Sequence, residues 1–492
     1  MVQQTRPVRF LLGEERRELS GLDPNTTVLN YLRRVERRTG TKEGCGEGDC
    51  GACTIVLGEL DGERLTYRAV NSCIQFVGML DGKQVLTVED LAEPDGTLHP
   101  CQQAMVDCHG SQCGFCTPGF VMSLFALYQE AGASDRNRID DALAGNLCRC
   151  TGYGPIVAAA RAMKAGQPDR FTRHARQTIA ALKALSAGAS ASLEGEGRRY
   201  FAPRSSAELA QLLLQHPNAT ILGGGTDVGL WVTKQLRSLD TIIYVGEVAD
   251  LKQIKVDERW IEIGAGVTYS QALATIEAHY PDIAEMMRRL GSEQIRNTGT
   301  IGGNIANGSP IGDSPPSLIA LGSRLVLQRG DQQRELALED FFLDYGKQDR
   351  QPGEFVAAVR IPVADPSRVL RCYKVSKRFD QDITAALGAF ALTLSGDMVE
   401  DIRICFGGMA PTPKRAKAAE AALNGKPWTR EAVEAACEAL AEDYTPITDM
   451  RASAQYRLKV AQNLLRKFFI ETTDSEAKTR ILAERRAAHA GA

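Results

Sequence analysis

The chain has 492 residues, of which 43% are hydrophobic and 24% charged, and its net charge is −3. This composition is typical of a globular protein with several domains, and the small net charge gives no basic field for nucleic acid or an anionic membrane. No apolar run approaches the roughly 20 residues of a membrane helix, and the first residues have no apolar core of a signal peptide. We therefore expect a cytoplasmic protein.

The first 92 residues predict a small mixed sheet with one helix. Residues 8–13 alternate in polarity, residues 26–38 have a helical pattern, and strands are expected at 54–57 and 85–88. A glycine-rich loop with three cysteines precedes the strand expected at 54–57. We expect that loop to lie at the edge of the sheet.

The three cysteines of this loop, Cys45, Cys50 and Cys53, have the spacing C-x₄-C-x₂-C, and Cys73 follows. This is the ligand pattern of a plant-type [2Fe–2S] cluster. The neighbouring glycines allow positive φ angles and a close approach of backbone N–H groups to the sulfurs. The alternative is a structural zinc site, although zinc sites more often use paired C-x₂-C knuckles.

Helical patterns follow around residues 99–108, 117–131, 136–144 and 154–165, which together predict a four-helix bundle. Thr117 is the expected N-cap of the second helix, with Pro118 in its first helical position and Gly132 as its stop signal.

Six cysteines accompany these helices, and a second cluster needs four. Those that precede two helix N-termini are favoured, because helix dipoles and free N–H groups stabilise an anionic group there. The predicted ligands are Cys113, Cys116, Cys148 and Cys150. Cys101 and Cys108 are expected to be spare, and the three cysteines near the C-terminus to be buried core residues.

Residues 169–196 are expected to be a surface linker, because their last part is small, polar and without period. Two glycine-rich loops follow, at 221–232 and 298–316. The first could cradle a pyrophosphate, although it matches neither the Rossmann fingerprint nor a P-loop, and the second is expected between short strands. The last segment combines an alternating strand pattern with a long helix.

In their order, the motifs "GCGEGDCGACTIVLG", "SQCGFCTPGFVMSL", "NLCRCTGYGPI", "GGGTDVG" and "GTIGGNIANGSPIGD" resemble the molybdenum hydroxylase family. The likeness is greatest to the iron–sulfur and FAD module of its xanthine-oxidising bacterial members. The resemblance implies an α+β multidomain fold with four parts: a β-grasp ferredoxin-like domain (1–92), a four-helix [2Fe–2S] bundle (93–168), an FAD domain of the vanillyl-alcohol-oxidase type (197–368) and a C-terminal flavoprotein domain (369–492).

The resemblance also implies site residues. The expected FAD contacts are Gly223, Gly224, Gly225, Thr226, Asp227, Val228, Leu290, Thr300, Gly303, Asn304, Asp313, Val356 and Lys374. Gln112 matches a glutamine that reaches the molybdopterin, which is expected on a partner polypeptide.

The implied function is electron transfer. A partner's molybdenum centre would oxidise xanthine or hypoxanthine to urate, and electrons would pass through the bundle cluster, the ferredoxin-like cluster and FAD to NAD⁺. No catalytic residue is expected in this chain, which would pair with the molybdenum subunit in a heterotetramer. The alternatives are the same module acting with an aldehyde, nicotinate or other N-heteroaromatic hydroxylase, a stand-alone NADH reductase, and a redox-sensing protein.

Overall fold

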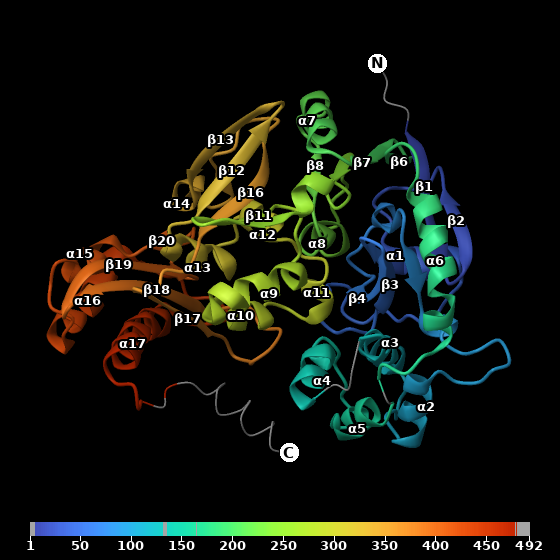
Figure 1. The fold of residues 1–492 in the computed structure, drawn as a ribbon, viewed down its shortest axis with the longest axis horizontal. Helices are drawn as coiled ribbons and strands as arrows, with labels where there is room; N and C mark the ends of the chain where they lie inside the picture. Colours follow the sequence, from blue (N-terminus) through green and yellow to red (C-terminus); the bar gives the residue numbers. More distant parts are fainter. Residues whose placement is uncertain (1–4, 131–134, 164, 478, 480–492) are drawn as a thin grey trace.

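The computed structural model describes residues 5–130, 135–163, 165–477 and 479. Four domains follow one another: an N-terminal domain with β1–β5, a helical domain with α2–α5, a middle domain from β6 to β16, and a C-terminal domain from β17 to α17. Figure 1 shows the middle domain between the C-terminal domain and the two others. Among the described helices, none is both long and apolar enough to cross a lipid bilayer.

The N-terminal domain is the predicted mixed sheet. Strand β1 pairs antiparallel with β2 and parallel with β5, and β3 pairs antiparallel with both β4 and β5. The predicted helix is short, because α1 continues into a π-helical turn at Tyr31–Val35. The element bounds are β1 Arg6–Leu12, β2 Glu15–Leu19, α1 Val28–Asn30, β3 Thr54–Asp61, β4 Arg64–Asn71 and β5 Gln84–Leu86.

The helical domain contains the four predicted helices: α2 Pro100–Asp107, α3 Thr117–Tyr128, α4 Arg136–Leu143 and α5 Gly154–Ala162. Helix α3 is central, since all its residues from Gly119 on are buried. The predicted cap is wrong by one position. Cys116 is the N-cap residue, and the Thr117 hydroxyl bonds with Ser111 instead of capping the helix. The predicted stop, Gly132, lies outside the described residues.

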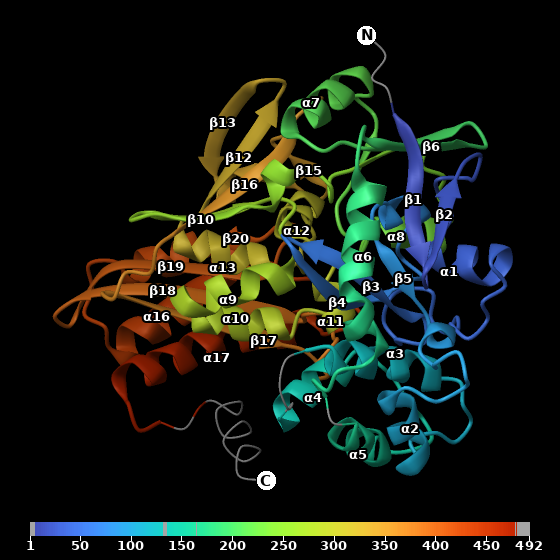
Figure 2. The same cartoon turned by 45° about the vertical axis from the view of Figure 1, so that its right-hand side comes forward.

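The expected linker at 169–196 is a regular structure, and this prediction was wrong. Helix α6 (Arg170–Ser186) begins at Asp169, whose carboxylate accepts from Thr172 N–H at 2.8 Å. Its Leu182 and Leu185 pack on Leu11 of β1, and Figure 2 shows the helix alongside this strand. The small-residue stretch that suggested a loop forms the antiparallel β6–β7 hairpin.

The first half of the middle domain continues the N-terminal sheet. Strand β6 pairs in parallel with β1, so that one sheet runs in the order β4-β3-β5-β1-β6-β7-β9-β8, with β2 beside β1. The two domains therefore share a backbone hydrogen-bond network rather than a flexible joint. The bounds are β6 Ala191–Gly195, β7 Arg198–Ala202, α7 Ser206–Gln215, β8 Thr220–Leu222, α8 Val228–Thr233 and β9 Thr241–Tyr244.

The second half has a separate five-stranded sheet in the order β10-β11-β16-β12-β13. Helices α9, α10, α12 and α13 pack with this sheet in one hydrophobic core. Its strands are β10 Ile254–Val256, β11 Trp260–Gly264, β12 Arg324–Arg329, β13 Gln332–Ala337 and β16 Phe355–Pro362, and β14 Phe342–Asp344 pairs with β15 Lys347–Gln348. Its helices are α9 Tyr269–His279, α10 Pro281–Arg288, α11 Glu293–Arg296, α12 Ile301–Asn307, α13 Ser314–Leu321 and α14 Leu338–Phe341.

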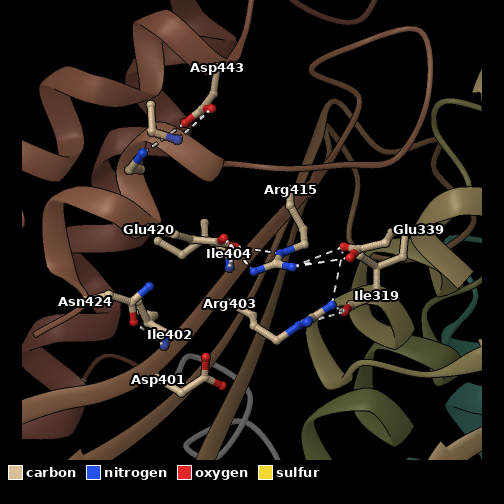
Figure 3. A network of polar contacts seen from close by, with 12 residues as sticks. Ile319, Glu339, Asp401, Ile402, Arg403, Ile404, Arg415, Glu420, Asn424 and Asp443 are labelled. Carbon is tan, nitrogen blue, oxygen red and sulfur yellow. Dashed lines mark hydrogen bonds and ion pairs between the residues drawn. The ribbon is translucent and has the colours of Figure 1, made fainter. Parts of the chain in front are cut away.

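The C-terminal domain packs helices on a four-stranded sheet, and both its predicted strand pattern and its final helix are confirmed. A polar network joins it to the middle domain (Figure 3). Arg403 and Arg415 both donate to Glu339 of α14 at 3.3 Å, and Arg415 also pairs with the buried Glu420 at 2.7 Å. The bounds are β17 Arg368–Val375, β18 Ala386–Ser395, β19 Met398–Gly407, β20 Lys414–Arg415, α15 Lys417–Leu423, α16 Arg430–Asp443 and α17 Ala454–Thr473.

Candidate functional site

The β3–β4 hairpin positions the first group of cysteines. Cys53 directly precedes β3, and Cys73 follows β4, whose Asn71 lies opposite Thr54. This register brings the two buried thiols close enough for Cys73 to lower the pKa of Cys53. Cys45 and Cys50 belong to the first cysteine loop, which we define as residues 42–53, and are half-buried.

Backbone N–H groups of this loop converge on Cys45. Those of Glu47, Asp49 and Cys50 each lie 3.4 Å from Cys45 Sγ. The Cys50 thiol and these N–H groups stabilise the thiolate and lower the pKa of Cys45 to about 5, against the effect of burial. The loop thus favours the deprotonated form of Cys45, whereas the contact with Cys45 and burial raise the pKa of Cys50.

The glycines have the role that the sequence suggested. Gly46, Gly48 and Gly51 have φ angles of 66°, 79° and 70°, and a Cβ on Gly44 would lie 2.7 Å from Cys50 Sγ. Among the described residues, no three His, Cys, Asp or Glu side chains are placed to hold a single metal ion. Four thiols with the C-x₄-C-x₂-C spacing in a glycine-rich cradle fit a two-iron cluster.

The second group lies where two helices begin. Cys113 and Cys116 precede α3, and Cys148 and Cys150 lie in the C-x-C loop (residues 144–153) between α4 and α5. Cys113 lies close enough to Cys150, and Cys116 close enough to Cys148, for each neighbour to shift the pKa of the other thiol. The structure therefore brings together the four cysteines that were predicted as ligands.

The two spare cysteines have other surroundings. Cys101 is fully buried, and its Sγ lies 3.0 Å from Nδ1 of His99; burial raises the pKa of this thiol. Cys108 is the C-cap residue of α2 and packs against the core of the helical domain. Gln112, by contrast, is exposed beside Cys113, on the surface where Cys113 and Cys150 are also exposed.

The first glycine-rich loop connects strand β8 to helix α8, which begins inside the predicted range of 221–232. A Cβ on Gly224 would lie 1.8 Å from the Thr298 carbonyl oxygen, and one on Gly223 would lie 3.0 Å from Thr300 Oγ1. Gly225 has a φ of 76°. The two predicted loops are therefore in direct backbone contact, although about 75 residues separate them in the sequence.

The remaining residues of this loop lead into α8. Thr226 lies beside Gly299 of the second loop, and Val228 opens α8 and packs on the N-terminal core. Asp227 accepts from Trp231 Nε1 at 3.1 Å, and burial raises the pKa of its carboxyl. Asp227 thus bonds to its own helix.

The second loop is helical, and the prediction of flanking short strands was wrong. Thr300 is the N-cap of α12 and accepts from Gly303 N–H at 3.0 Å. Asn304 follows in the same helix, and among the described residues its buried Oδ1 has no hydrogen-bond partner. A buried acceptor of this kind beside two touching glycine loops fits the hydroxyl or amino groups of a dinucleotide such as FAD.

Asp313 lies at the start of α13 and joins the middle domain to the C-terminal domain. Its Oδ2 accepts from Lys374 Nζ at 2.6 Å, and its Oδ1 accepts from the buried Thr384. Lys374 also donates to the carbonyl of Arg289, next to Leu290, at 3.1 Å. Val356 is buried in β16, which packs on α12. Hydrogen bonds thus join Asp313, Lys374 and the segment before Leu290 at the boundary of the two domains.

Sequence reasoning missed the residues that join the first cysteine loop region to this flavin region. Gln75 Nε2 donates to the Gly224 carbonyl at 2.9 Å, and a Cβ on Gly225 would lie 2.8 Å from the Ile74 carbonyl. Both residues follow Cys73 directly. Their only sequence signal is this adjacency to a predicted ligand.

Four families match consecutive parts of the chain. Residues 11–77 match a 2Fe-2S iron-sulfur cluster binding domain, and residues 87–161 match a [2Fe-2S] binding domain. Residues 193–364 match the FAD binding domain in molybdopterin dehydrogenase, and residues 371–472 match the CO dehydrogenase flavoprotein C-terminal domain.

Whole proteins are also similar. The chain is 30% identical to xanthine dehydrogenase of Emericella nidulans over 97% of this chain and 40% of that protein. It is 32% identical to xanthine dehydrogenase 2 of Arabidopsis thaliana over 85% of this chain and 36% of that protein. A solved carbon monoxide dehydrogenase from Hydrogenophaga pseudoflava has a TM-score of 0.52 and 31% identity, covering 55% of this chain and 94% of its own. The chain thus spans about 40% of the length of the curated relatives it matches.

Proposed function

The chain belongs to the molybdenum hydroxylase family as its iron–sulfur and flavin electron-transfer module, and we propose that it carries electrons from a partner's molybdenum centre to NAD⁺. In this proposal the partner's centre oxidises xanthine or hypoxanthine to urate. When bound, the clusters exchange single electrons and FAD exchanges electron pairs with NAD⁺.

We assign the two clusters to the two groups of four thiols. Cys45, Cys50, Cys53 and Cys73 would hold one cluster, and Cys113, Cys116, Cys148 and Cys150 the other. The chain's contribution at the first group includes the Cys50 thiol and the backbone N–H groups that lower the pKa of Cys45.

We assign FAD to the region of the two glycine loops. The backbone of Gly223–Val228 would face the pyrophosphate, and the buried Oδ1 of Asn304 would accept from the ligand. The Asp313–Lys374 pair would fix the junction of the two domains that enclose it.

The observation that carries the proposal is that the three sites adjoin one another through backbone contacts. Leu147 N–H, beside Cys148, donates to the Cys50 carbonyl at 3.0 Å. On the other side of the first cysteine loop, Gln75 donates to Gly224 of the flavin region. The first cysteine loop thus contacts the C-x-C loop on one side, and the segment after Cys73 contacts the flavin region on the other. This is the order of sites that a one-electron relay ending at a flavin would use.

The surface around Cys113 and Cys150 fits the docking of a partner. Both thiols are exposed, and so are the apolar side chains of Phe115 (49%), Leu147 (41%) and Tyr153 (40%). Exposed apolar groups clustered around a redox site indicate an interaction surface. We propose that the molybdenum subunit covers it, which would bring its cofactor next to Gln112.

The experiment is to express the chain with and without a molybdenum subunit from the same cell. Alone, the chain should hold four irons and one FAD, reduce a dye with NADH and leave xanthine unchanged. Adding the partner should give urate, and Cys116→Ser should abolish urate formation while sparing most NADH-to-dye activity, because dye reduction needs only the flavin end.

Each part of the proposal has its own contradiction. Xanthine oxidation by the isolated chain would overturn the division of labour. If the complex oxidises an aldehyde or another heteroaromatic in place of xanthine, the proposed substrate is wrong but the proposed electron-transfer module still holds. If the complex reduces a dye with xanthine as donor but does not reduce NAD⁺, the acceptor in this proposal is wrong.

A further inference from the structure

Gln294 of α11 lies where the N-terminal, helical and middle domains meet. Its side chain is fully buried, and Nε2 donates to Asn146 Oδ1 at 3.0 Å, Ser123 Oγ at 3.2 Å and Thr54 Oγ1 at 3.3 Å. One acceptor follows Cys53, one lies in helix α3, and one precedes Cys148 by two residues. A residue of the middle domain thus bonds to both cysteine loops and to the helix between them.

The acceptors are themselves bonded to one another. Ser123 Oγ donates to Asn146 Oδ1 at 2.7 Å, and both Thr54 Oγ1 and Asn146 Nδ2 donate to the Gly51 carbonyl, at 2.7 and 3.2 Å. Gly51 lies between two cysteines of the first cysteine loop. The network therefore ends on the backbone that carries those thiols.

Glycines allow this junction to be so close. A Cβ on Gly51 would lie 2.2 Å from the Gly145 carbonyl, and one on Gly119 would lie 2.2 Å from the Gly51 carbonyl. A Cβ on Gly145 would lie 2.0 Å from Gln294 Oε1. The two cysteine loops and α3 are thus in backbone contact, and the amide of Gln294 fills the remaining space between them.

We propose that Gln294 is a positioning residue whose amide locks the two cysteine loops together and so fixes the separation of the two clusters. Electron transfer between centres depends steeply on their distance, so a joint held by the buried hydrogen bonds of Gln294 Nε2 keeps the relay uniform. Gln294 Oε1 itself has no hydrogen-bond partner among the described residues. Among the described residues, the hydrogen bonds of Gln294 go to Asn146, Ser123 and Thr54 and not to a cysteine, so it acts through these neighbours. The inference rests on the two proposed clusters, but not on the partner, the substrate or NAD⁺.

The test uses the whole chain with its cofactors and the variant Gln294→Leu, which keeps the side-chain size and removes the amide. In the chemically reduced protein, electron paramagnetic resonance measures the spin–spin splitting between the two clusters as well as the signal of each. Amide hydrogen exchange of residues 50–54 and 144–150 measures how often the joint opens. The matched control is Gln75→Leu, which removes another buried amide that bridges two domains, on the flavin side.

Gln294→Leu should keep both cluster signals and should reduce or broaden the spin–spin splitting between them. It should also raise amide hydrogen exchange in these segments by about tenfold, because losing a buried hydrogen-bonded group changes an opening equilibrium by about this factor. Gln75→Leu should leave the splitting unchanged. Unchanged splitting and exchange in a cofactor-complete Gln294→Leu protein would overturn the proposal.

If Gln294→Leu does not accumulate, Ser123→Ala decides, because it removes a single hydroxyl of the same network. A two- to threefold rise in exchange is expected there, and no rise would refute the role of the junction. Absence of clusters in the wild-type chain would count against the proposed function instead, so that the two failures are distinguishable.

Discussion

Asp313 and Lys374 form an ion pair of 2.6 Å in which both side chains are less than 10% exposed, between the start of α13 and strand β17. Because both side chains are buried, water could not solvate either charge if its partner were removed. The pair connects the middle and C-terminal domains at the predicted flavin region. Removing one partner of a buried ion pair lowers the free energy of unfolding by a measurable amount, because the other charge stays buried without a counter-charge.

Replacing Asp313 by Asn should leave the Lys374 ammonium buried without a counter-charge and cost about 3–5 kcal/mol. We expect lower FAD content per chain and near-normal iron, measured by absorbance and metal analysis. The double variant Asp313→Asn/Lys374→Met should recover much of the loss. Lys183→Ala, which breaks an exposed pair with Glu63, should change stability by about 0.5 kcal/mol or less. Equal loss of iron and FAD would indicate general unfolding.

The choice among the cysteines of the helical domain is tested by two serine variants. Cys108→Ser should keep two distinct [2Fe–2S] signals in electron paramagnetic resonance, because Cys108 packs at the end of α2. Cys113→Ser should lose one signal, because Cys113 lies with Cys150 in the second group. Loss of a signal in the Cys108 variant would overturn the assignment.

Gly224→Ala tests the contact of the two glycine loops. The new methyl group would lie 1.8 Å from the Thr298 carbonyl, and such overpacking typically costs about 1–3 kcal/mol. FAD retention after gel filtration should fall by at least about tenfold, with both cluster signals unchanged. Gly154→Ala is the matched control, because a Cβ there meets nothing within 4 Å. Equal FAD retention in the two variants would refute the predicted contact.

His216 should give the middle domain a pH dependence. Its ring stacks on Phe201, and burial together with the charge of Arg199 lowers its pKa from the ordinary 6.5. The stability that the neutral ring contributes is therefore fully present above pH 6.5 and is lost as the pH falls from 6.5 through the lower pKa of the folded state.

The measurement is the unfolding temperature of wild type and His216→Gln between pH 8 and pH 5.5. The wild type should lose more stability on acidification, by about 0.5 kcal/mol or less. Arg199→Met should also make the stability less dependent on pH than in the wild type, because it removes the charge that helps to lower the pKa of His216. Parallel profiles for all three proteins would disprove the role of His216.

Phe115→Asp should weaken binding of the molybdenum subunit by at least about tenfold, because truncating an exposed aromatic anchor at the centre of an interface costs about 1–4 kcal/mol. Cluster signals and NADH-to-dye activity should persist. Leu236→Asp, at an 84% exposed position after α8, should leave partner binding unchanged. Unchanged binding by Phe115→Asp would place the interface elsewhere, and equal weakening by both variants would show that the effect is not specific to this surface.

The sequence by itself determined the local chemistry. The spacing of Cys45, Cys50 and Cys53, with glycines between them, encodes a metal-binding loop, because ligand spacing and positive φ angles are properties of a few consecutive residues. The choice of Cys148 and Cys150 over Cys108 came from helix starts, which are also local signals. Helix periodicity predicted the bundle for the same reason.

Only the tertiary structure decided what joins these parts. Residues 169–196 were expected to be a linker because their composition is polar and small, but α6 gains its stability from Leu182 and Leu185 packing on β1, and β6 gains its hydrogen bonds from the N-terminal sheet. Gln294 and Thr54 are 240 positions apart, and Gln75 and Gly224 are 149 apart. No periodicity or spacing encodes such a pair, because a single buried amide finds its partners only when whole domains dock.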